Sequence, residues 1–368
     1  MKVAHLTSVH PRHDTRIFLK MCSSLSSHGH EVALIVADGL GDESKAGVKI
    51  VDVGKASDNR VKRIVSSSRK VLEQAIKLDA DIYHAHDPEL LPACVKLKAM
   101  GKTVIFDAHE DFPKQLLAKP YLNWFSQRIL SFAATVYERF ACKQLDAIIT
   151  ATPSIQIKFA EINSNSVAIN NYPILGELDS KERRIGESSR TVVYVGGISR
   201  VRGIYPLIDS LSETNDVRLD LIGNFSEEEV GGAARSHANW EKVNHHGFLG
   251  REEVASYLST SIAGMVTFLE SPNHIESQPN KMFEYMSAAL PVISSKFPLW
   301  REIIEGNDCG ICVDPEKPKD IAAAINSLVS NPAEAERLGR NGKSAVERVY
   351  NWGREEGKLL ELYISLVK

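Results

Sequence analysis

The sequence predicts an α/β protein made of two doubly wound, Rossmann-like domains. Short apolar runs typical of buried strands alternate with helical stretches along the whole chain, which is the pattern of parallel sheets covered by helices. A charged and polar stretch at about 175–190 divides the 368 residues into halves, each long enough to bury its own core. We expect the two sheets to face each other across a cleft, with ligands beyond the carboxyl ends of the strands.

Strands and helices alternate in both halves. The first half has predicted strands at 3–7, 31–36, 82–85, 103–107 and 147–150, and predicted helices at 15–28, 60–78, 89–100 and about 121–144. The second half has predicted strands at 191–195, 217–222, 263–267 and 291–294, and helices from about 204 and at 281–289. The predicted domains are 1–175 and 176–350, followed by a last helix at about 351–368.

The composition excludes several classes of function. With 44 basic and 47 acidic residues, the net charge of −3 argues against nucleic-acid binding through bulk positive charge. No apolar run approaches the ~20 residues of a membrane span, and the first residues lack a signal-peptide core, so we expect a cytoplasmic protein. Five cysteines make no disulfide framework, and Cys309 and Cys312 fit a short strand better than a zinc or redox site.

The strongest local motif is a pair of glutamates, Glu276 and Glu284, eight positions apart. Pro279 suits the start of a helix that Ser277 or Asn280 could cap, and free amides at such a start bind phosphate. Glu284, one turn into that helix, has a carboxylate that can accept two ribose hydroxyls. Glu276 precedes the helix and is expected to face whatever the phosphate carries. Ordinary capping with solvated charges is the alternative.

A second motif follows the predicted strand at 191–195. Gly196 and Gly197 allow a ligand to approach the backbone closely, and Arg200 and Arg202 can bind phosphate oxygens. The spacing is not the G-x-G-x-x-G of a dinucleotide-binding fold, so a dehydrogenase is disfavoured. Two solvated arginines in a loop are the alternative.

Histidines and carboxylates follow two predicted strands of the first half. His84, His86 and Asp87 belong to one group, and Asp107 and His109 to the next. Such clusters suit a metal site. We prefer polar loops at the mouth of a sheet, one of them lining a substrate, because no helix carries the paired histidines of a metalloprotease.

These motifs, in this order, resemble the retaining glycosyltransferases of family 4, which have the GT-B fold. The resemblance covers essentially the whole chain, and its most specific element is the E-x7-E pattern of Glu276 and Glu284 with the following EYMSAALPVI. The segment 350–364 looks like the family's last helix, which returns to the first domain. Three segments resemble a polysaccharide- and lipopolysaccharide-assembly subgroup, and they are 10–17, 86–89 and 107–110.

The resemblance implies a role for each matching residue. Glu284 binds the nucleotide ribose, and Glu276 contacts the donor sugar on its reacting face. Amides at the start of the helix hold the diphosphate, which Arg202 neutralises. His109 contacts the sugar near the reacting carbon. The implied catalytic residues are His109 and Glu276; the donor-binding residues are Gly196, Gly197, Arg200, Arg202, Asn280, Lys281 and Glu284; and the residues of the first-domain cleft are His13, Arg16, His86 and Asp87.

The sequence departs from the family at two places. Gly197 stands where the family usually has arginine, and Arg200 is a candidate to compensate for that loss. The family's glycine-rich loop after the first strand is replaced by residues 10–16.

The resemblance implies transfer of a sugar from a nucleotide-diphosphate sugar to a saccharide or lipid-linked saccharide, with retention of configuration. Basic side chains and helix amides can stabilise the departing diphosphate, so we expect no divalent metal and no cofactor. A front-face route, in which the leaving phosphate helps to deprotonate the acceptor, is our mechanistic hypothesis. A sugar-nucleotide epimerase of the same fold and a non-catalytic sugar-nucleotide-binding scaffold are the alternatives.

Two basic segments of the first half suggest contact with a membrane. Residues 55–77 carry seven basic and two acidic side chains, and residues 114–143 carry five and one. A basic helix with aromatic residues can lie on an anionic membrane, so we expect a peripheral location on its inner face. A core-facing apolar stripe is the alternative for 114–143. The aromatic residues interleaved there are Tyr121, Trp124, Phe125 and Phe132.

Overall fold

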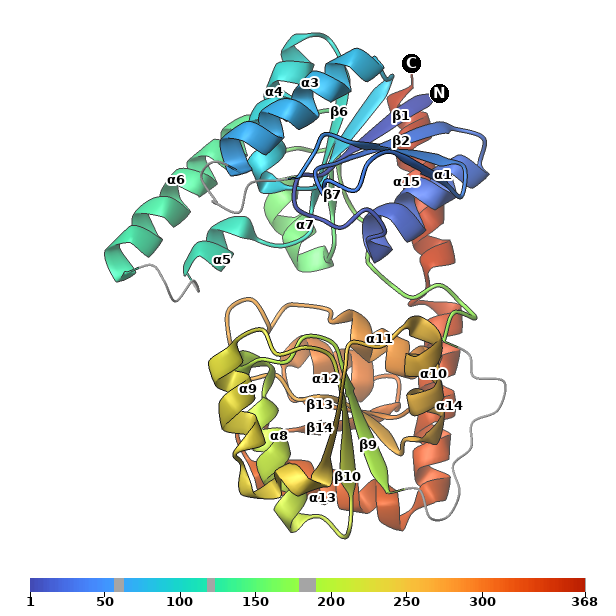
Figure 1. The fold of residues 1–368 in the computed structure, drawn as a ribbon. Coiled ribbons are helices and arrows are strands. Elements are labelled where there is room, and N and C mark those ends of the chain that lie inside the picture. The colour runs from blue at the N-terminus through green and yellow to red at the C-terminus, as the bar shows by residue number, and fades with distance from the viewer. Residues whose placement is uncertain (56–62, 118–122, 179–189, 368) are drawn as a thin grey trace. The chain divides into compact units, whose positions relative to one another are not determined.

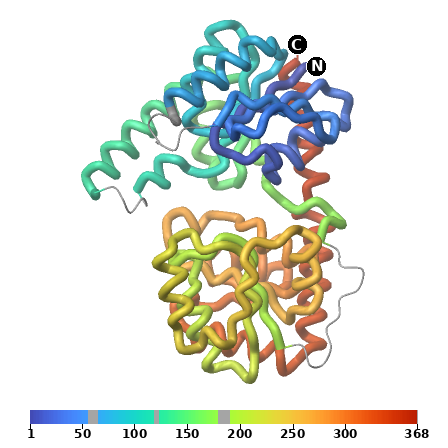
Figure 2. Tube along the Cα trace, viewed as in Figure 1, coloured from blue at the N-terminus to red at the C-terminus, as the bar shows by residue number. Residues whose placement is uncertain are grey.

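The structure, a computed structural model, describes residues 1–55, 63–117, 123–178 and 190–367 (Figure 1). The chain divides into two compact units. Unit 1 comprises Met1–Asn171 and Arg354–Lys368, and unit 2 comprises Tyr172–Gly353. Both chain ends belong to unit 1, where they lie close together (Figure 2). Most of the predicted linker, 179–189, lies outside the described residues.

Unit 1 is built on an eight-stranded sheet in the order β3-β4-β2-β1-β5-β6-β7-β8, parallel except for the β3–β4 pair. Its central strands are mostly apolar and almost wholly buried, as expected for a parallel sheet covered on both faces. The strands are β1 (Lys2–Leu6), β2 (Glu31–Val36), β3 (Glu43–Lys45), β4 (Val48–Asp52), β5 (Ile82–Ala85), β6 (Thr103–Ala108), β7 (Ala147–Thr150) and β8 (Ser166–Ala168).

The helices of unit 1 begin at recognisable signals. Asp14 accepts the first amides of η1, Asn123 caps α6, and Thr152 followed by a proline caps α7. The helical segments are η1 (Thr15–Cys22), α1 (Ser23–Ser27), η2 (Arg63–Ser67), α3 (Ser68–Leu78), η3 (Pro88–Leu90), α4 (Leu91–Ala99), α5 (Phe112–Leu117), α6 (Trp124–Cys142) and α7 (Pro153–Ala160). Nearly all of α15 (Trp352–Leu366) also belongs to unit 1.

Unit 2 has a six-stranded, wholly parallel sheet in the order β11-β10-β9-β12-β13-β14. The strands are β9 (Thr191–Val195), β10 (Arg218–Ile222), β11 (Val243–Gly247), β12 (Ala263–Val266), β13 (Val292–Ser295) and β14 (Gly310–Val313). The helical segments are η4 (Arg200–Arg202), α8 (Ile204–Ser210), η5 (Leu211–Glu213), α9 (Glu228–Arg235), η6 (Ala238–Lys242), α10 (Arg251–Thr260), α11 (Asn280–Ser287), α12 (Pro298–Ile304), α13 (Pro318–Ser330) and α14 (Pro332–Arg348).

The predicted α/β class with a parallel sheet in each half is confirmed, and each predicted strand has an observed counterpart. The strands β3, β4, β8 and β11 were not predicted; β3 and β11 carry little apolar pattern, whereas β4 has three buried apolar residues. The C-x-x-C pair lies at strand β14, as expected, with Cys309 buried just before it.

One expectation for the helix after Glu276 is wrong. Its N-cap is Pro279, and no side chain caps it, so neither Ser277 nor Asn280 has the capping role.

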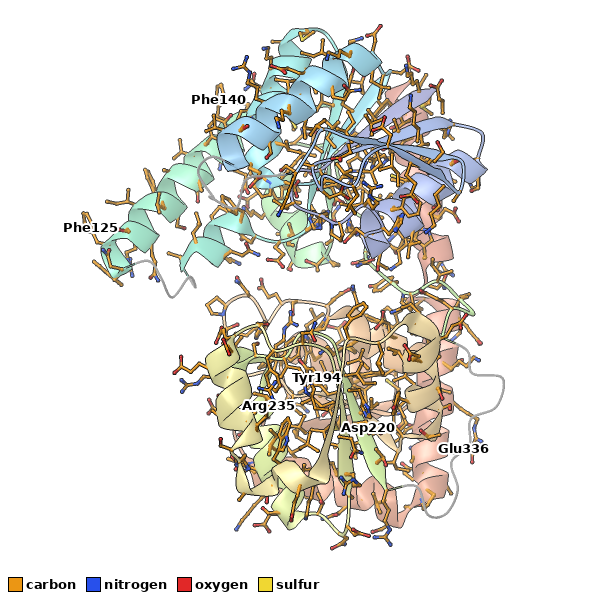
Figure 3. The ribbon with its side chains drawn as sticks, in the orientation of Figure 1. Phe125, Phe140, Tyr194, Asp220, Arg235 and Glu336 are labelled. Carbon is orange, nitrogen blue, oxygen red and sulfur yellow. The ribbon has the colours of Figure 1, made fainter. Side chains whose placement is uncertain are left out.

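The helix α6 does not fit one of the two interpretations of residues 114–143. A core-facing apolar stripe requires buried apolar residues, but only Glu138, Ala141 and Cys142 of α6 are buried. The stripe is exposed instead, with Phe132 71% and Phe125 66% accessible. Figure 3 shows the labelled Phe125 and Phe140 projecting from α6. Among the described residues, no helix is long and apolar enough to cross a membrane.

Candidate functional site

The topology of unit 2 predicts where a ligand binds. Counted within the unit, the strand order is 3-2-1-4-5-6, and the order reverses between β9 and β12. Open parallel sheets bind ligands beyond the carboxyl ends of the strands at such a reversal. Gly196 follows β9, and the segment 267–279 that contains Glu276 follows β12. The two sequence motifs therefore meet at this edge of the sheet.

Short contacts confirm that the two motifs are neighbours. The amide of Val195 donates to the Tyr285 hydroxyl at 2.8 Å, which ties β9 to α11. Gly203 has a φ of +77°, and a Cβ there would lie 1.8 Å from the carbonyl oxygen of Thr267. Only glycine allows this approach, because any side chain would collide with that backbone. The arginine–glycine pair is thus held against the segment that follows β12.

The N-terminus of α11 faces this edge without a side-chain cap. Helix N-termini have unpaired amides and a partial positive charge, and both favour an anion. Asn280 is exposed at the first helical position, and Glu276 is exposed in the segment that precedes the helix. This is the arrangement that the sequence predicts for a phosphate at the helix start.

Lys281 lies at the second position of α11 and is only 8% exposed. Its Nζ lies 3.5 Å from the centroid of the Tyr194 ring and has no hydrogen-bond partner among the described residues. The same atom lies 3.4 Å from where a Cβ of Gly196 would be. Figure 3 shows Tyr194 inside unit 2. The Nζ of Lys281, which has no hydrogen-bond partner among the described residues, therefore lies directly against the glycine turn.

Arg202 reaches the same turn from η4. Its Nη1 donates to the carbonyl oxygen of Gly197 at 2.9 Å, and it lies 2.7 Å from where a Cβ at position 197 would be. The guanidinium thus lies where a side chain at position 197 would begin. Arg200 is exposed on the same short helix.

Glu284 is fixed by an arginine that the sequence analysis missed. Arg251, at the start of α10, donates to Glu284 Oε1 and to Glu177 Oε1, each at 2.8 Å. Burial disfavours the charged guanidinium, but these two carboxylates raise the pKa of Arg251 further above its usual value. One carboxylate oxygen of Glu284 is therefore already paired with an arginine of the protein. Nothing in the local sequence of Arg251 pointed to this pairing, because its partners are 33 and 74 residues away.

Unit 1 has an equivalent edge between β1 and β5, where its strand order reverses. Asp87 follows β5 and accepts hydrogen bonds from the Thr7 hydroxyl and from the amide and hydroxyl of Ser8, which follow β1. The Nε2 of His10 lies 3.3 Å from the other oxygen of Asp87. Burial disfavours the charged imidazole of His10, but Asp14 and Asp87 outweigh this and raise its pKa.

Asp107 is the centre of a second group in unit 1. It is fully buried and accepts two bonds from Arg16, at 2.8 and 2.7 Å. The Nδ1 of His86 and the Nε2 of His109 also approach its Oδ2, at 3.2 and 2.9 Å. Burial favours the neutral carboxyl, but Arg16 and the histidines hold the pKa of Asp107 well below its usual value. Asp107 is therefore ionised, and both imidazoles lie within hydrogen-bond distance of it.

A chain of hydrogen bonds leads from His86 through His5 to Tyr363 of α15. Burial lowers the pKa of His86 and, more strongly, of His5 and His84, so all three are neutral. His5 Nδ1 then donates to His86 Nε2 at 2.9 Å, and Tyr363 donates to His5 and accepts from His84 Nδ1. This assignment leaves one buried lone pair, His84 Nε2, without a partner; the opposite orientation of the hydroxyl leaves two groups unpaired.

The histidines also group as metal ligands would, and the spacing of one pair, His5 and His86, fits a hydrogen bond better. His5, His84 and His86 form one such group, and His86, Asp107 and His109 form another. Two imidazoles on one zinc ion, at about 2.0–2.1 Å each, stand about 3.3 Å apart at a tetrahedral angle. The 2.9 Å between His5 Nδ1 and His86 Nε2 is shorter and is that of a shared proton.

The remaining predicted residues of unit 1 lie differently. Arg16 is 4% exposed, and its remaining terminal nitrogen donates to the Ile169 carbonyl, so it holds Asp107 in place. His13 is exposed and pairs with Glu43 at 3.3 Å instead of with the other histidines. Of the predicted set in unit 1, the structure brings His86, His109 and Arg16 together around Asp107.

Comparison with known proteins gives matches in both halves. Residues 15–169 match the family described as Glycosyltransferase Family 4, and residues 177–345 match the family described as Glycosyl transferases group 1. Spore coat protein SA of Bacillus subtilis is 27% identical over 47% of this chain, and the match spans 48% of that protein. A phosphatidyl-myo-inositol mannosyltransferase of Mycobacterium leprae is 24% identical over 77% of this chain and 73% of that protein.

Solved structures share the fold over the whole chain. The sucrose-phosphate synthase of Thermosynechococcus elongatus has a TM-score of 0.79 and 16% identity, over 99% of this chain and 98% of that one. The Anabaena protein Alr3699/HepE, solved with UDP and glucose, has a TM-score of 0.75 and 13% identity, over 99% of this chain and all of that one. The fold is that of the GT-B glycosyltransferases, and both family matches support a glycosyltransferase.

Proposed function

We propose that this GT-B protein transfers a glycosyl group from a nucleotide-diphosphate sugar to a saccharide or lipid-linked saccharide, with retention of configuration. One observation carries the proposal. An uncapped helix N-terminus and two basic side chains, Lys281 and Arg202, meet at a glycine turn at the strand reversal of unit 2. No ion pair between either side chain and a described carboxylate is present, so the place is suited to an anion such as a diphosphate.

The proposed donor site orders the groups of the donor along the edge of the sheet. The diphosphate lies at the glycine turn, and the ribose lies at the free oxygen of Glu284, whose other oxygen Arg251 holds. The donor sugar lies toward Glu276, ahead of the helix. The two basic side chains and the helix amides stabilise the departing diphosphate without a divalent metal. The Anabaena protein Alr3699/HepE was solved with UDP, which supports a nucleotide-diphosphate ligand.

The proposed reaction follows a front-face route. As the bond between the sugar and the diphosphate breaks, positive charge develops on the sugar, as in glycoside hydrolysis. The leaving phosphate accepts the proton of the attacking hydroxyl, and Glu276 stabilises the charged sugar. Glu276→Gln is therefore expected to lower kcat by roughly 10²-fold or more with little change in donor binding, because the lost charge acts mainly in the transition state. Near-normal turnover would remove this role from Glu276.

The first test is thermal unfolding with UDP-, GDP-, ADP- and dTDP-sugars and the bare diphosphates, in EDTA. A ligand at ~100 times its Kd adds about 2.7 kcal/mol to stability, which shifts Tm measurably. We expect a shift for one nucleotide that survives EDTA, followed by transfer to an added saccharide. Donor consumption without an acceptor, leaving an epimerised sugar, would favour the epimerase. Binding with neither reaction would favour the scaffold.

A second proposal concerns α6, whose exposed stripe needs a partner. Five apolar side chains at helical spacing form the stripe, and they are Phe125, Ile129, Phe132, Val136 and Phe140. Arg128 and Arg139 are exposed on the same helix, and its one carboxylate, Glu138, is buried in an ion pair with Lys158. We propose that α6 lies on an anionic membrane, since apolar and basic side chains together favour that surface.

The membrane proposal is tested by flotation with vesicles of anionic or neutral phospholipid. Replacing Phe125 and Phe132 by serine is expected to lower binding to anionic vesicles at least tenfold. Ile157→Ser is the matched control, since Ile157 is 70% exposed on α7 of the same unit. Equal binding of all three proteins would contradict the proposal. In the other basic segment, 55–77, residues 56–62 lie outside the described residues, and so does Tyr121 beside α6.

A further inference from the structure

The buried amine of Lys281 has a consequence for how the donor site of unit 2 binds its ligand. We propose that Lys281 is an uncharged amine in the empty site and takes up one proton from solvent when a diphosphate binds at the Gly196–Gly197 turn. The lone pair of Nζ accepts the proton and becomes an ammonium ion, so each ligand that binds brings one proton with it. This inference rests on the proposed function of the site and adds a regulation by pH to it.

The surroundings of Lys281 favour the uncharged form. Nζ has no hydrogen-bond partner among the described residues and lies between the rings of Tyr194, at 3.5 Å, and Phe268, at 5.2 Å. Burying an ammonium ion without a partner costs several kcal/mol, more than aromatic faces return. Burial therefore lowers the pKa of Lys281 well below its usual value.

The charged groups around Lys281 shift its pKa in opposite directions. Arg202 on η4 is a second cation and lowers the pKa of Lys281 further, while Glu284 on its own helix opposes this. Glu284 is already held by Arg251, which weakens its effect on Lys281. The facing phenols, Tyr194 of β9 and Tyr285 of α11, have pKa values raised by burial, so both stay neutral. Arg202 is therefore the cation beside the glycine turn in the empty site, and it disfavours a second charge on Lys281.

A bound diphosphate favours the charged form of Lys281 over the uncharged form. Its negative charges at the turn stabilise a second cation in a region of low dielectric, where charges interact far more strongly than in water. A side chain needed only for packing would be apolar, because an unpaired lysine adds nothing that methionine lacks. The glycine at position 196 leaves room for Nζ, since a Cβ there would lie 3.4 Å from it. The negative charge of the bound diphosphate therefore explains why position 281 is a lysine.

Calorimetry of ligand binding in buffers of different ionisation enthalpy measures the protons taken up. The probe is the nucleotide-diphosphate sugar selected by the thermal-shift panel, at about pH 8. A sugar ester of the diphosphate is suitable because it has no terminal phosphate group with a pKa near 6. We expect an uptake that approaches one proton per ligand in the wild type. Between the pKa values of Lys281 in the free and bound states, Kd should rise up to tenfold per pH unit.

Lys281→Met and Lys319→Met are the matched variants, since Lys319 is exposed on α13 of the same unit. Lys281→Met is expected to abolish proton uptake, weaken binding at least tenfold, and leave Tm of the empty protein equal or higher. Lys319→Met should behave as the wild type. Binding without proton uptake in the wild type would overturn the inference and leave the proposed function intact. No binding of any nucleotide sugar would overturn both, and uptake that persists in Lys281→Met would assign the proton to another group.

Discussion

Both units place polar residues at the carboxyl ends of their parallel strands, but the two units differ in how these residues are paired. In unit 1 the ionised Asp107 has four hydrogen-bond donors, and the histidines beyond it pair with one another. In unit 2 Lys281 and Arg202 have no described carboxylate to pair with. A charge that its neighbours already pair holds its own geometry, whereas a charge without a counter-charge favours a ligand of opposite charge. The contrast predicts that substitutions in unit 1 mainly change stability and those in unit 2 mainly change binding.

The largest expected effect on stability is that of Asp107→Asn in unit 1. The substitution leaves the buried guanidinium of Arg16 without its counter-charge, and breaking a buried pair in this way costs about 3–5 kcal/mol. Urea unfolding measures the loss. The double variant with Arg16→Met is the control, and it should recover much of the stability. A single variant as stable as the wild type would mean that unit 1 does not depend on this pair.

Arg202→Ala in unit 2 is expected to lower activity much more than stability. We expect kcat/KM to fall by roughly 10²–10³-fold, as when one donor to a developing negative charge is removed. Tm should change little, because Arg202 has no ion pair to lose. Arg200→Ala is the matched control, and a loss under tenfold would show that Arg202, and not Arg200, compensates for the missing arginine at Gly197. Equal losses would reverse that conclusion.

Tyr363→Phe removes one hydroxyl from the histidine cluster. His84 Nδ1 and His5 Nε2 both lose their partner, and a buried unpaired polar group costs about 1–3 kcal/mol. Denaturant unfolding should show this loss, while Kd for the nucleotide sugar in unit 2 stays unchanged. A change in Kd without a loss of stability would contradict the separation of roles between the units.

The last effect, spread over three histidines, comes from acid. The folded pKa values of His5, His84 and His86 lie below their usual value near 6.5, so the unfolded chain binds more protons. Their contribution is complete above about pH 6.5 and is lost as the pH falls below it, by at most about 1.4 kcal/mol for each histidine and pH unit. Unfolding measured between pH 7 and about pH 5.5 should show this slope, and His84→Gln should reduce it by one third. An unchanged slope would mean that His84 is charged in the folded protein.

The sequence predicted the strands well, because strands buried on both faces are continuous apolar runs. Thr103–Ala108 and Ala147–Thr150 are examples. It failed at Val243–Gly247, whose Asn-His-His core is polar and at most partly buried, so no apolar run marks it as a strand. It left two interpretations open for the face of α6, because periodicity shows that a helix has an apolar side but not whether anything covers it.

The candidate site was predicted by residue type better than by contact. Glu276, Glu284, Gly196 and Arg202 were recognised from local spacing, and the structure brings the two motifs together. The pairing of Arg251 with Glu284 and the burial of Lys281 against Tyr194 could not be predicted, because both depend on how distant strands align. The link from His5 to Tyr363 spans 358 residues and leaves no local signal.

That same link sets an order of assembly during synthesis. Residues 1–171 leave the ribosome first, and domains generally fold as they emerge. Yet the hydroxyl that pairs with His84 arrives with Tyr363, and Glu355 supplies the carboxylate that accepts from the amide and side chain of Asn170. The first unit to be synthesised is therefore the last to be completed. A nascent chain that stalls after unit 2 therefore has a unit 1 that lacks the Tyr363 hydroxyl beside its histidines and the Glu355 carboxylate beside Asn170.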